Sequence, residues 1–159
     1  MKAEFFTRSL IETQKLAGIF ASELKGGETF CLCGPIGSGK TAFTQGIAKE
    51  LGIPEVPASA SFALMRSYTG RLKLFHFDLF RLDSSDMRNL GIEECLADKK
   101  AVVVAEWADP AVEYLPIDRV HISFELAGGD GRKIKALGCG LSSSVLIKKA
   151  ENLWKKEKK

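Results

Sequence analysis

The stretch CLCGPIGSGKTAF (Cys31–Phe43) passes from an apolar run into a glycine-rich turn and then into a segment with helical spacing. Gly34, Gly39, Lys40 and Thr41 satisfy the pattern G-x-x-x-x-G-K-[S/T], which is typical of phosphate-binding loops between a strand and a helix. The glycines allow backbone N–H groups to turn towards phosphate oxygens, and the helix N-terminus favours an anion. The stretch therefore predicts a nucleotide site within an α/β fold.

Each position of this loop has an expected role. We predict that Lys40 contacts the β- and γ-phosphates and takes part in catalysis, whereas the Thr41 hydroxyl is a ligand of Mg²⁺. The chain lacks the N-K-x-D segment that reads guanine in GTP switches, so ATP is favoured over GTP. The predicted nucleotide contacts in the loop are Gly34, Pro35, Ile36, Gly37, Ser38, Gly39, Lys40, Thr41 and Ala42.

A phosphate loop needs acidic groups beside it before it can support hydrolysis. Glu106 follows the apolar run AVVVA (101–105), which is typical of a strand covered on both faces, and acids at such strand ends lie beside the phosphate loop. We predict that Glu106 holds Mg²⁺ or polarises the attacking water. Asp78 ends the predicted strand 72–78 and is the second candidate acid. The general base is therefore either Asp78 or Glu106.

Three neighbours of these acids each allow two interpretations. His76 shares a strand face with Asp78 and is either a packed, hydrogen-bonded histidine or a catalytic group. Arg81 either pairs with an acid or stabilises γ-phosphate charge, as an arginine finger does. Trp107 either stacks on a base or substrate or packs in the core.

Periodicity and turn residues predict the remaining elements. Ser9 and Glu12 have capping-box spacing, which indicates a helix that starts there and stops at Gly26 and Gly27. We therefore expect one three-layer α/β domain over residues 1–159, with a mainly parallel central sheet and antiparallel hairpins. The other expected elements are a strand over 29–33, a helix over 41–51, a surface loop over 53–61, a hairpin of strands 62–68 and 72–78, a helical region over 84–97, a second hairpin of strands 120–126 and 133–137, and a helix from Ser144.

Composition narrows the class of protein. Of the 159 residues, 45% are hydrophobic and 27% are charged, and no apolar run approaches the roughly 20 residues of a membrane span. No signal-peptide core opens the chain, so we expect a cytoplasmic protein without membrane contact. The four cysteines form no C-x-x-C pair and have no histidines nearby in sequence, which argues against zinc and favours buried thiols.

The basic charge gathers at the C-terminus. The formal net charge is +3, and the segment KKAENLWKKEKK (148–159) is rich in lysine and holds only two glutamates. This basic tail, from about residue 141, either contacts RNA phosphates or is a solvated helix end or frayed tail.

The motifs together resemble the TsaE family, the small bacterial ATPase of tRNA threonylcarbamoyladenosine synthesis. The resemblance extends to about Leu137, and the combination of motifs is far more specific than the phosphate loop alone. It rests on GPIGSGKT (34–41), SASFALMRSY (59–68), HFDLFRL (76–82), LGIEECL (90–96), EWAD (106–109) and LPIDRVHISF (115–124), in this order and spacing.

The resemblance implies a P-loop fold, ATP with Mg²⁺ as ligand, and slow hydrolysis stimulated by the TsaD and TsaB subunits, which work on tRNA adenosine 37. It also implies that Lys40 contacts phosphates, that Thr41 and Glu106 serve the metal, and that Asp78 belongs to the catalytic region. Trp107 matches the family's tryptophan, and Thr13 falls where the family has a threonine near the nucleotide.

The segment 59–62 resembles the family's S-P-T-F loop, which acts like a nucleotide-sensing switch. Here Ala60 replaces proline and Ser61 replaces threonine, while the hydroxyl is kept. Phe80 stands where the family usually has tyrosine, and Ala42 replaces the second threonine after the lysine. None of these changes removes a group that the expected mechanism needs.

A metabolite kinase is the alternative function. It would use the same loop but needs an acceptor pocket and usually an arginine-bearing lid, and the chain has no arginine-rich insertion after the run 101–105.

Overall fold

The computed structural model of the chain describes residues 1–58, 64–80 and 86–159. Arg81 and the whole segment 59–62 therefore lie outside the described residues, and the predictions that concern them stay predictions.

The described residues contain one sheet of seven strands in the order β1-β7-β6-β2-β5-β4-β3. β2 runs parallel to both β5 and β6, and β4 runs parallel to β5. The antiparallel pairs are β1 with β7, β6 with β7 and β3 with β4. The mainly parallel centre with antiparallel hairpins is confirmed. The strands are β1 (Lys2–Thr7), β2 (Thr29–Cys33), β3 (Met65–Thr69), β4 (Lys73–Asp78), β5 (Ala101–Glu106), β6 (Val120–Leu126) and β7 (Arg132–Gly138).

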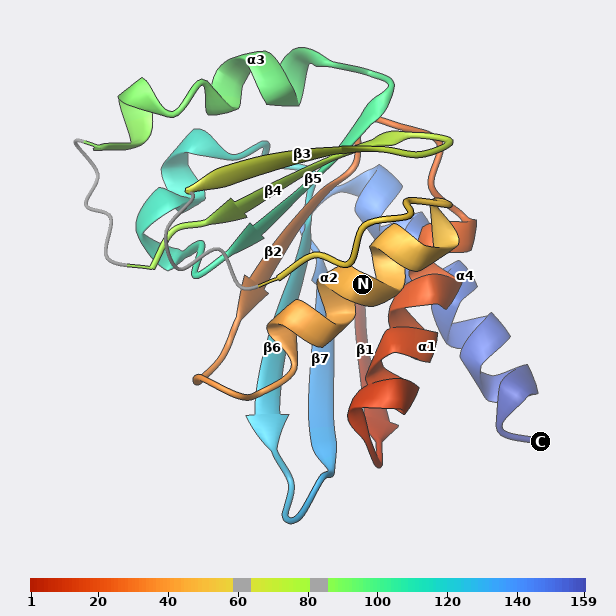
Figure 1. Cartoon of the computed structure of the whole chain (residues 1–159). Coiled ribbons are helices and arrows are strands. Elements are labelled where there is room, and N and C mark those ends of the chain that lie inside the picture. The colour runs from red at the N-terminus through yellow and green to blue at the C-terminus, as the bar shows by residue number, and fades with distance from the viewer. Residues whose placement is uncertain (59–63, 81–85) are drawn as a thin grey trace.

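Helices lie on both faces of this sheet and give the expected three layers (Figure 1). One face packs against α1 (Leu10–Ser22), α2 (Lys40–Glu50) and α4 (Leu141–Glu157). The other face packs against α3 (Ile92–Ala97) and the 3₁₀ segment η2 (Asp109–Tyr114). Among the described residues, no helix combines the length and apolarity needed to cross a membrane.

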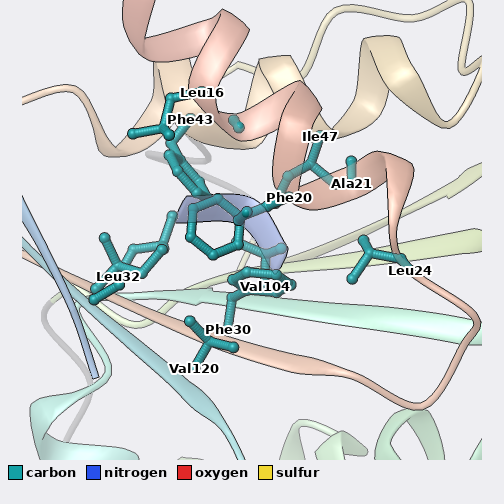
Figure 2. Close-up of a cluster of buried hydrophobic side chains, with 14 of the residues drawn as sticks. Leu16, Phe20, Ala21, Leu24, Phe30, Leu32, Phe43, Ile47, Val104 and Val120 are labelled. Carbon is teal, nitrogen blue, oxygen red and sulfur yellow. The ribbon is translucent and has the colours of Figure 1, made fainter. Parts of the chain in front are cut away.

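Phenylalanine rings form the centre of the larger core cluster. Phe20 from α1 contacts Phe5, Phe30 and Phe43, which come from β1, β2 and α2, with ring centroids 5.7–6.2 Å apart. Figure 2 shows Phe20, Phe30 and Phe43 packed together between the helices and the sheet. Edge-to-face contacts of this kind add to the stabilisation that burial of the rings provides. The core thus fixes α1 and α2 against the strands that precede and flank the glycine loop.

The start of α1 agrees with the sequence, but its end does not. Ser9 is the N-cap, and its Oγ accepts a hydrogen bond from Glu12 N at 3.1 Å. The helix ends at Ser22, earlier than the predicted stop at Gly26 and Gly27, and Glu23 is its C-cap residue. The Glu28 carboxylate accepts hydrogen bonds from the backbone N–H groups of Lys25 and Gly26, each at 2.8 Å.

Two other regions differ from their predicted forms. The structure adds strand β1, which the sequence analysis did not include. The helical region predicted over 84–97 is interrupted in its described part: the 3₁₀ segment η1 (Asp86–Asn89) precedes α3, and Gly91 between them has φ 67°. Glycine adopts this left-handed conformation readily, so the helix restarts there instead of running through.

The basic C-terminus is a packed helix and not a frayed tail. Helix α4 begins at Leu141, three residues before the predicted start, and buries Leu146, Ile147, Ala150 and Trp154, whereas Val145 is half exposed. Lys149 pairs with Glu23 at 2.8 Å, and Lys158 pairs with Glu12 at 3.0 Å. Two of the six lysines in the segment 148–159 thus form ion pairs with α1 and its C-cap residue, and the predicted tRNA contact stays a prediction.

Candidate nucleotide site

The glycine loop lies between the end of β2 and the start of α2, as the motif predicts. Gly34, Gly37 and Gly39 have φ of 149°, 75° and 110°, all in the region that favours glycine. A Cβ on Gly34 would lie 2.8 Å from Phe124 O and 2.9 Å from Ser38 Oγ. The loop can therefore hold this shape only with glycine at that position, and it leads directly into the N-terminus of an 11-residue helix. That end of a helix is suited to an anion.

Lys40 is buried within the loop, with 5% of its surface exposed. Its Nζ donates to Gly34 O at 2.6 Å and to Pro35 O at 2.9 Å, and it lies 4.0 Å from the centroid of the Trp107 ring. Burial lowers the pKa of Lys40, while the nearby Glu106 and Asp78 carboxylates act in the opposite direction. A cation is thus held at the loop with acids near it.

Glu106 ends β5 and is buried, with 2% of its surface exposed. One of its carboxylate oxygens, Oε1, lies 2.9 Å from His76 Nε2 and accepts a hydrogen bond from Thr44 Oγ1 at 3.2 Å. His76 is fully buried, which fits the packed, hydrogen-bonded interpretation, but its partner is the predicted metal-binding acid. Two side chains from different elements therefore fix the position of this carboxylate.

Asp78 lies beside Glu106 in the sheet. The register pairs Asp78 with Glu106 across β4 and β5, and pairs Leu32 with Glu106 across β2 and β5. The ends of three parallel strands therefore meet where the glycine loop begins. Asp78 is 5% exposed, and its Oδ1 accepts a hydrogen bond from Phe80 N at 3.1 Å.

Trp107 has φ 58°, the only positive value among the non-glycine residues that the structure describes. An aromatic residue is strained in this conformation, and such strain is held in place by surrounding contacts. The backbone N–H of Trp107 donates to Leu32 O at 3.0 Å. The half-buried ring has its centroid 4.9 Å from that of Phe80 and lies close to Lys40 Nζ. Trp107 thus both packs and faces the loop lysine.

Thr13 lies next to the loop, but its hydroxyl is already used. Its Oγ1 is 2.8 Å from Thr7 Oγ1 and donates to Ser9 O at 3.2 Å. Its methyl carbon lies 3.6 Å from where a Cβ on Gly39 would be. The methyl group of Thr13 therefore faces the loop, and its predicted nucleotide contact stays a prediction.

Arg132 and Thr44 belong to the site but were absent from the predicted residues. Arg132 begins β7, is 7% exposed, and donates through Nη2 to Gly37 O at 3.3 Å and through Nη1 to Asp130 O. Its Nε and the Ser38 Oγ are buried without hydrogen-bond partners in the described structure. Thr44 lies one helical turn after Lys40. This spacing from the motif could have indicated, from the sequence alone, that Thr44 is near the site.

The residues present fit a nucleotide with Mg²⁺. Two buried polar atoms beside the loop, Ser38 Oγ and Arg132 Nε, lack partners, and buried groups of this kind usually have one. Thr41, Asp78 and Glu106 supply only oxygen donors, which suit Mg²⁺. The predicted roles of these residues, and of Arg81 outside the described part, stay predictions.

Comparison with known proteins gives a consistent result. Residues 7–134 match the family model described as "Threonylcarbamoyl adenosine biosynthesis protein TsaE". The chain is 35% identical over 130 residues to the tRNA threonylcarbamoyladenosine biosynthesis protein TsaE of Bacillus subtilis (strain 168), covering 81% of each chain. It is 35% identical over 129 residues to the protein of that name from Treponema pallidum (strain Nichols), covering 80% of this chain and 95% of the relative. The crystal structure of Bacillus subtilis YdiB superposes with a TM-score of 0.82 at 30% identity, over 96% of this chain and 95% of the other.

Proposed function

This chain belongs to the TsaE family, and from that membership we propose that it is a P-loop ATPase that supports the formation of threonylcarbamoyladenosine at position 37 of tRNA. It binds ATP with Mg²⁺, hydrolyses it slowly alone and turns over when the TsaD and TsaB subunits engage it. The chain acts as one domain over residues 1–159 in the cytoplasm. The names of its relatives support a role in threonylcarbamoyladenosine biosynthesis on tRNA, and the residues of the candidate site support ATP hydrolysis.

The register at the ends of β2, β4 and β5 is the observation that carries this proposal. It brings two buried carboxylates to the edge of the sheet where the glycine loop begins. A phosphate-binding loop without such acids could only bind an anion, whereas acids at this edge can serve a metal ion and a water molecule.

The residues of the chain divide the work of hydrolysis. Lys40 and the N-terminus of α2 would bind and orient the phosphates, because both bring positive charge to the loop. Mg²⁺, when bound by Thr41 and Glu106, neutralises charge that develops on those oxygens. Asp78 or Glu106 accepts the proton of the attacking water, and both are held by hydrogen bonds that fix their oxygens.

ATP hydrolysis by the purified chain, with and without TsaD and TsaB, tests the proposal. We expect stimulation by the partners in the wild type. Lys40→Ala should weaken ATP affinity at least about tenfold, because it removes charge-assisted hydrogen bonds. Glu106→Gln should lower the turnover rate at least about a hundredfold while the chain still binds ATP.

Lys49→Ala and Glu113→Gln are the matched controls, because both residues are exposed and lie near the replaced groups in sequence. Both controls should behave as the wild type does. Undiminished turnover in Lys40→Ala and Glu106→Gln would contradict the proposal. Rapid phosphorylation of a small metabolite would favour the kinase instead.

A further inference from the structure

Three metal-binding side chains that are far apart in sequence meet on the face of the sheet opposite α1 and α2. Cys33 ends β2, Asp109 begins η2 and His121 lies on β6, and one ligand atom of each lies within 4.8 Å of the others. Leu32 and Ile122 belong to the core under α1 and α2. They are the strand neighbours of Cys33 and His121, respectively. Because side chains alternate along a strand, Cys33 and His121 point to the other face.

We propose that Cys33, Asp109 and His121 bind a divalent ion of the Zn²⁺ class, through side chains that are not among the predicted nucleotide contacts. Thiolate, imidazole and carboxylate together are typical ligands of Zn²⁺, and three protein ligands leave a fourth position for water. At the nucleotide site, the predicted metal ligands Thr41 and Glu106 offer oxygen donors, which suit Mg²⁺. The two sites therefore differ in the ions that they select.

The sequence spacing argued against zinc, because no histidine is near a cysteine in the chain. The fold removes that argument: the parallel pairing of β2 with β6 sets Cys31 opposite His121 and Cys33 opposite Ser123. His121 and Cys33 are thus close neighbours in the sheet despite their separation in sequence. Asp109 then reaches both from the segment that follows Trp107.

The protonation states of the three side chains set the condition for binding. Burial, together with the hydrogen bond to Asp109, raises the pKa of Cys33 to about 12, so the neutral thiol donates to Asp109 Oδ1 at 3.2 Å. Burial lowers the pKa of His121, so its imidazole is neutral and able to bind a metal ion. Arg119 also lowers the pKa of His121, and its positive charge opposes a bound cation, whereas Asp109 favours one.

Binding replaces the S–H bond of Cys33 with a bond from the thiolate to the ion and releases the proton to solvent. No redox change or further reactant is required. Because the thiol must lose its proton, metal binding should tighten as the pH rises.

Titration of the full chain with Co²⁺ and with Zn²⁺ tests this site. Near pH 7.5 the wild type should bind one ion per chain, and Co²⁺ should produce a near-ultraviolet charge-transfer band that requires a thiolate ligand. Cys33→Ser should lose that band. His121→Asn and Asp109→Asn should keep part of the band and bind Zn²⁺ at least about tenfold more weakly.

Two controls separate this site from other metal binding. Cys139→Ser removes a thiol that is outside the cluster, and Glu106→Gln removes the acid of the nucleotide site; both should keep the band and the Zn²⁺ affinity. Circular dichroism shows whether each variant is folded, and Asp109→Asn changes an exposed residue, so it serves if Cys33→Ser does not fold. Absence of a band in the wild type, or Zn²⁺ binding that is unchanged in His121→Asn and Asp109→Asn, would overturn the proposal.

Discussion

Helix α2 contributes to two regions: the aromatic core, and the edge of the sheet where the phosphate loop begins. Different interactions hold these two regions together. Phe43 of α2 contacts Phe20, Phe30 and Phe124 through non-directional packing, and all four rings are at most 2% exposed. Lys40 begins the same helix and lies among buried polar side chains that directional hydrogen bonds hold in place. Lys40 Nζ donates to Gly34 O, and Glu106 Oε1 is held by Thr44 and His76.

The difference between them decides what each region tolerates. A core of apolar rings loses stability roughly in proportion to the volume removed, and nearby side chains partly fill the space. A buried polar group has few partners, so the loss of one leaves a specific atom unsatisfied or misplaced. Mutations in the core should therefore change the free energy of unfolding, and mutations at the edge should change activity.

Phe20→Ala should have the largest effect, because Phe20 contacts three other rings and is fully buried. We expect the free energy of unfolding to fall by about 4 kcal/mol. Urea denaturation measures this. Phe6→Ala is the control, since Phe6 is 58% exposed on β1 and its loss should change stability by less than about 1 kcal/mol. Equal losses in both variants would contradict the assignment of the core.

Gly46→Ala should lower stability by about 2 kcal/mol, because α1 and α2 touch at this point. A Cβ on Gly46 would lie 2.2 Å from Gln14 O and 2.7 Å from Ala17 Cβ. Gly18→Ala on the facing helix is the control: its Cβ would meet no atom closer than 3.8 Å, so helix propensity should stabilise it by about 0.5–1 kcal/mol. Thermal denaturation should show shifts of opposite sign, and shifts of the same sign would refute the packing argument.

His76→Ala tests whether a substitution beside the phosphate loop changes the rate of ATP hydrolysis more than the free energy of unfolding. His76 fixes the Glu106 carboxylate, so we expect kcat for ATP hydrolysis to fall about tenfold, or about 1.4 kcal/mol, with little change in KM. His76→Gln keeps a donor near the Nε2 position and should restore part of the rate. Wild-type kcat in both variants would show that His76 only packs.

Asp118→Ala should have the smallest effect, a loss of about 1 kcal/mol of stability at pH 7. The Asp118 carboxylate accepts hydrogen bonds from the N–H groups of Ser142 and Ser143 at the start of α4, each at 2.9 Å. Burial raises the pKa of Asp118, but these hydrogen bonds outweigh it, and the pKa is lowered overall. A lowered pKa in the folded state stabilises the protein above the unfolded pKa of about 4, and that contribution is lost as the pH falls.

The loss should therefore shrink below about pH 4, and denaturation at pH 7 and pH 3 measures it. Asp118→Asn keeps an oxygen acceptor and should cost less, with little dependence on pH. A loss in Asp118→Ala that is the same at both pH values would show that the charge plays no part.

The sequence predicts those elements whose structure depends on residues that are close together in the chain. The strands 29–33 and 120–126 have their predicted bounds, because uninterrupted or alternating apolar residues specify them. The segment KAEFFT also alternates between exposed and buried positions, but it is short and forms β1 only by pairing with β7, more than a hundred residues later. Such pairing is not visible in a local pattern.

The same limit applies to the site. The glycine motif located the loop, and the ends of two predicted strands gave Asp78 and Glu106 as its candidate acids. The register places both acids at the edge where the loop begins. Arg132 and the contact between Cys33 and His121 depend on strand order, which brings β6 and β7 to the side of β2 away from β5. His76 could be placed beside Glu106 only once the two strands were known to be neighbours.

The position of Glu106 on an inner strand defines a fixed reference for following the molecule through a reaction cycle. β5 is hydrogen-bonded on both sides, by β2 and β4, so neighbouring strands hold the backbone under this acid from both sides. Structures of different nucleotide states can therefore be superposed on residues 29–33, 74–78 and 101–106. Displacements measured in that frame then belong to the connecting segments and to side chains, and not to the sheet.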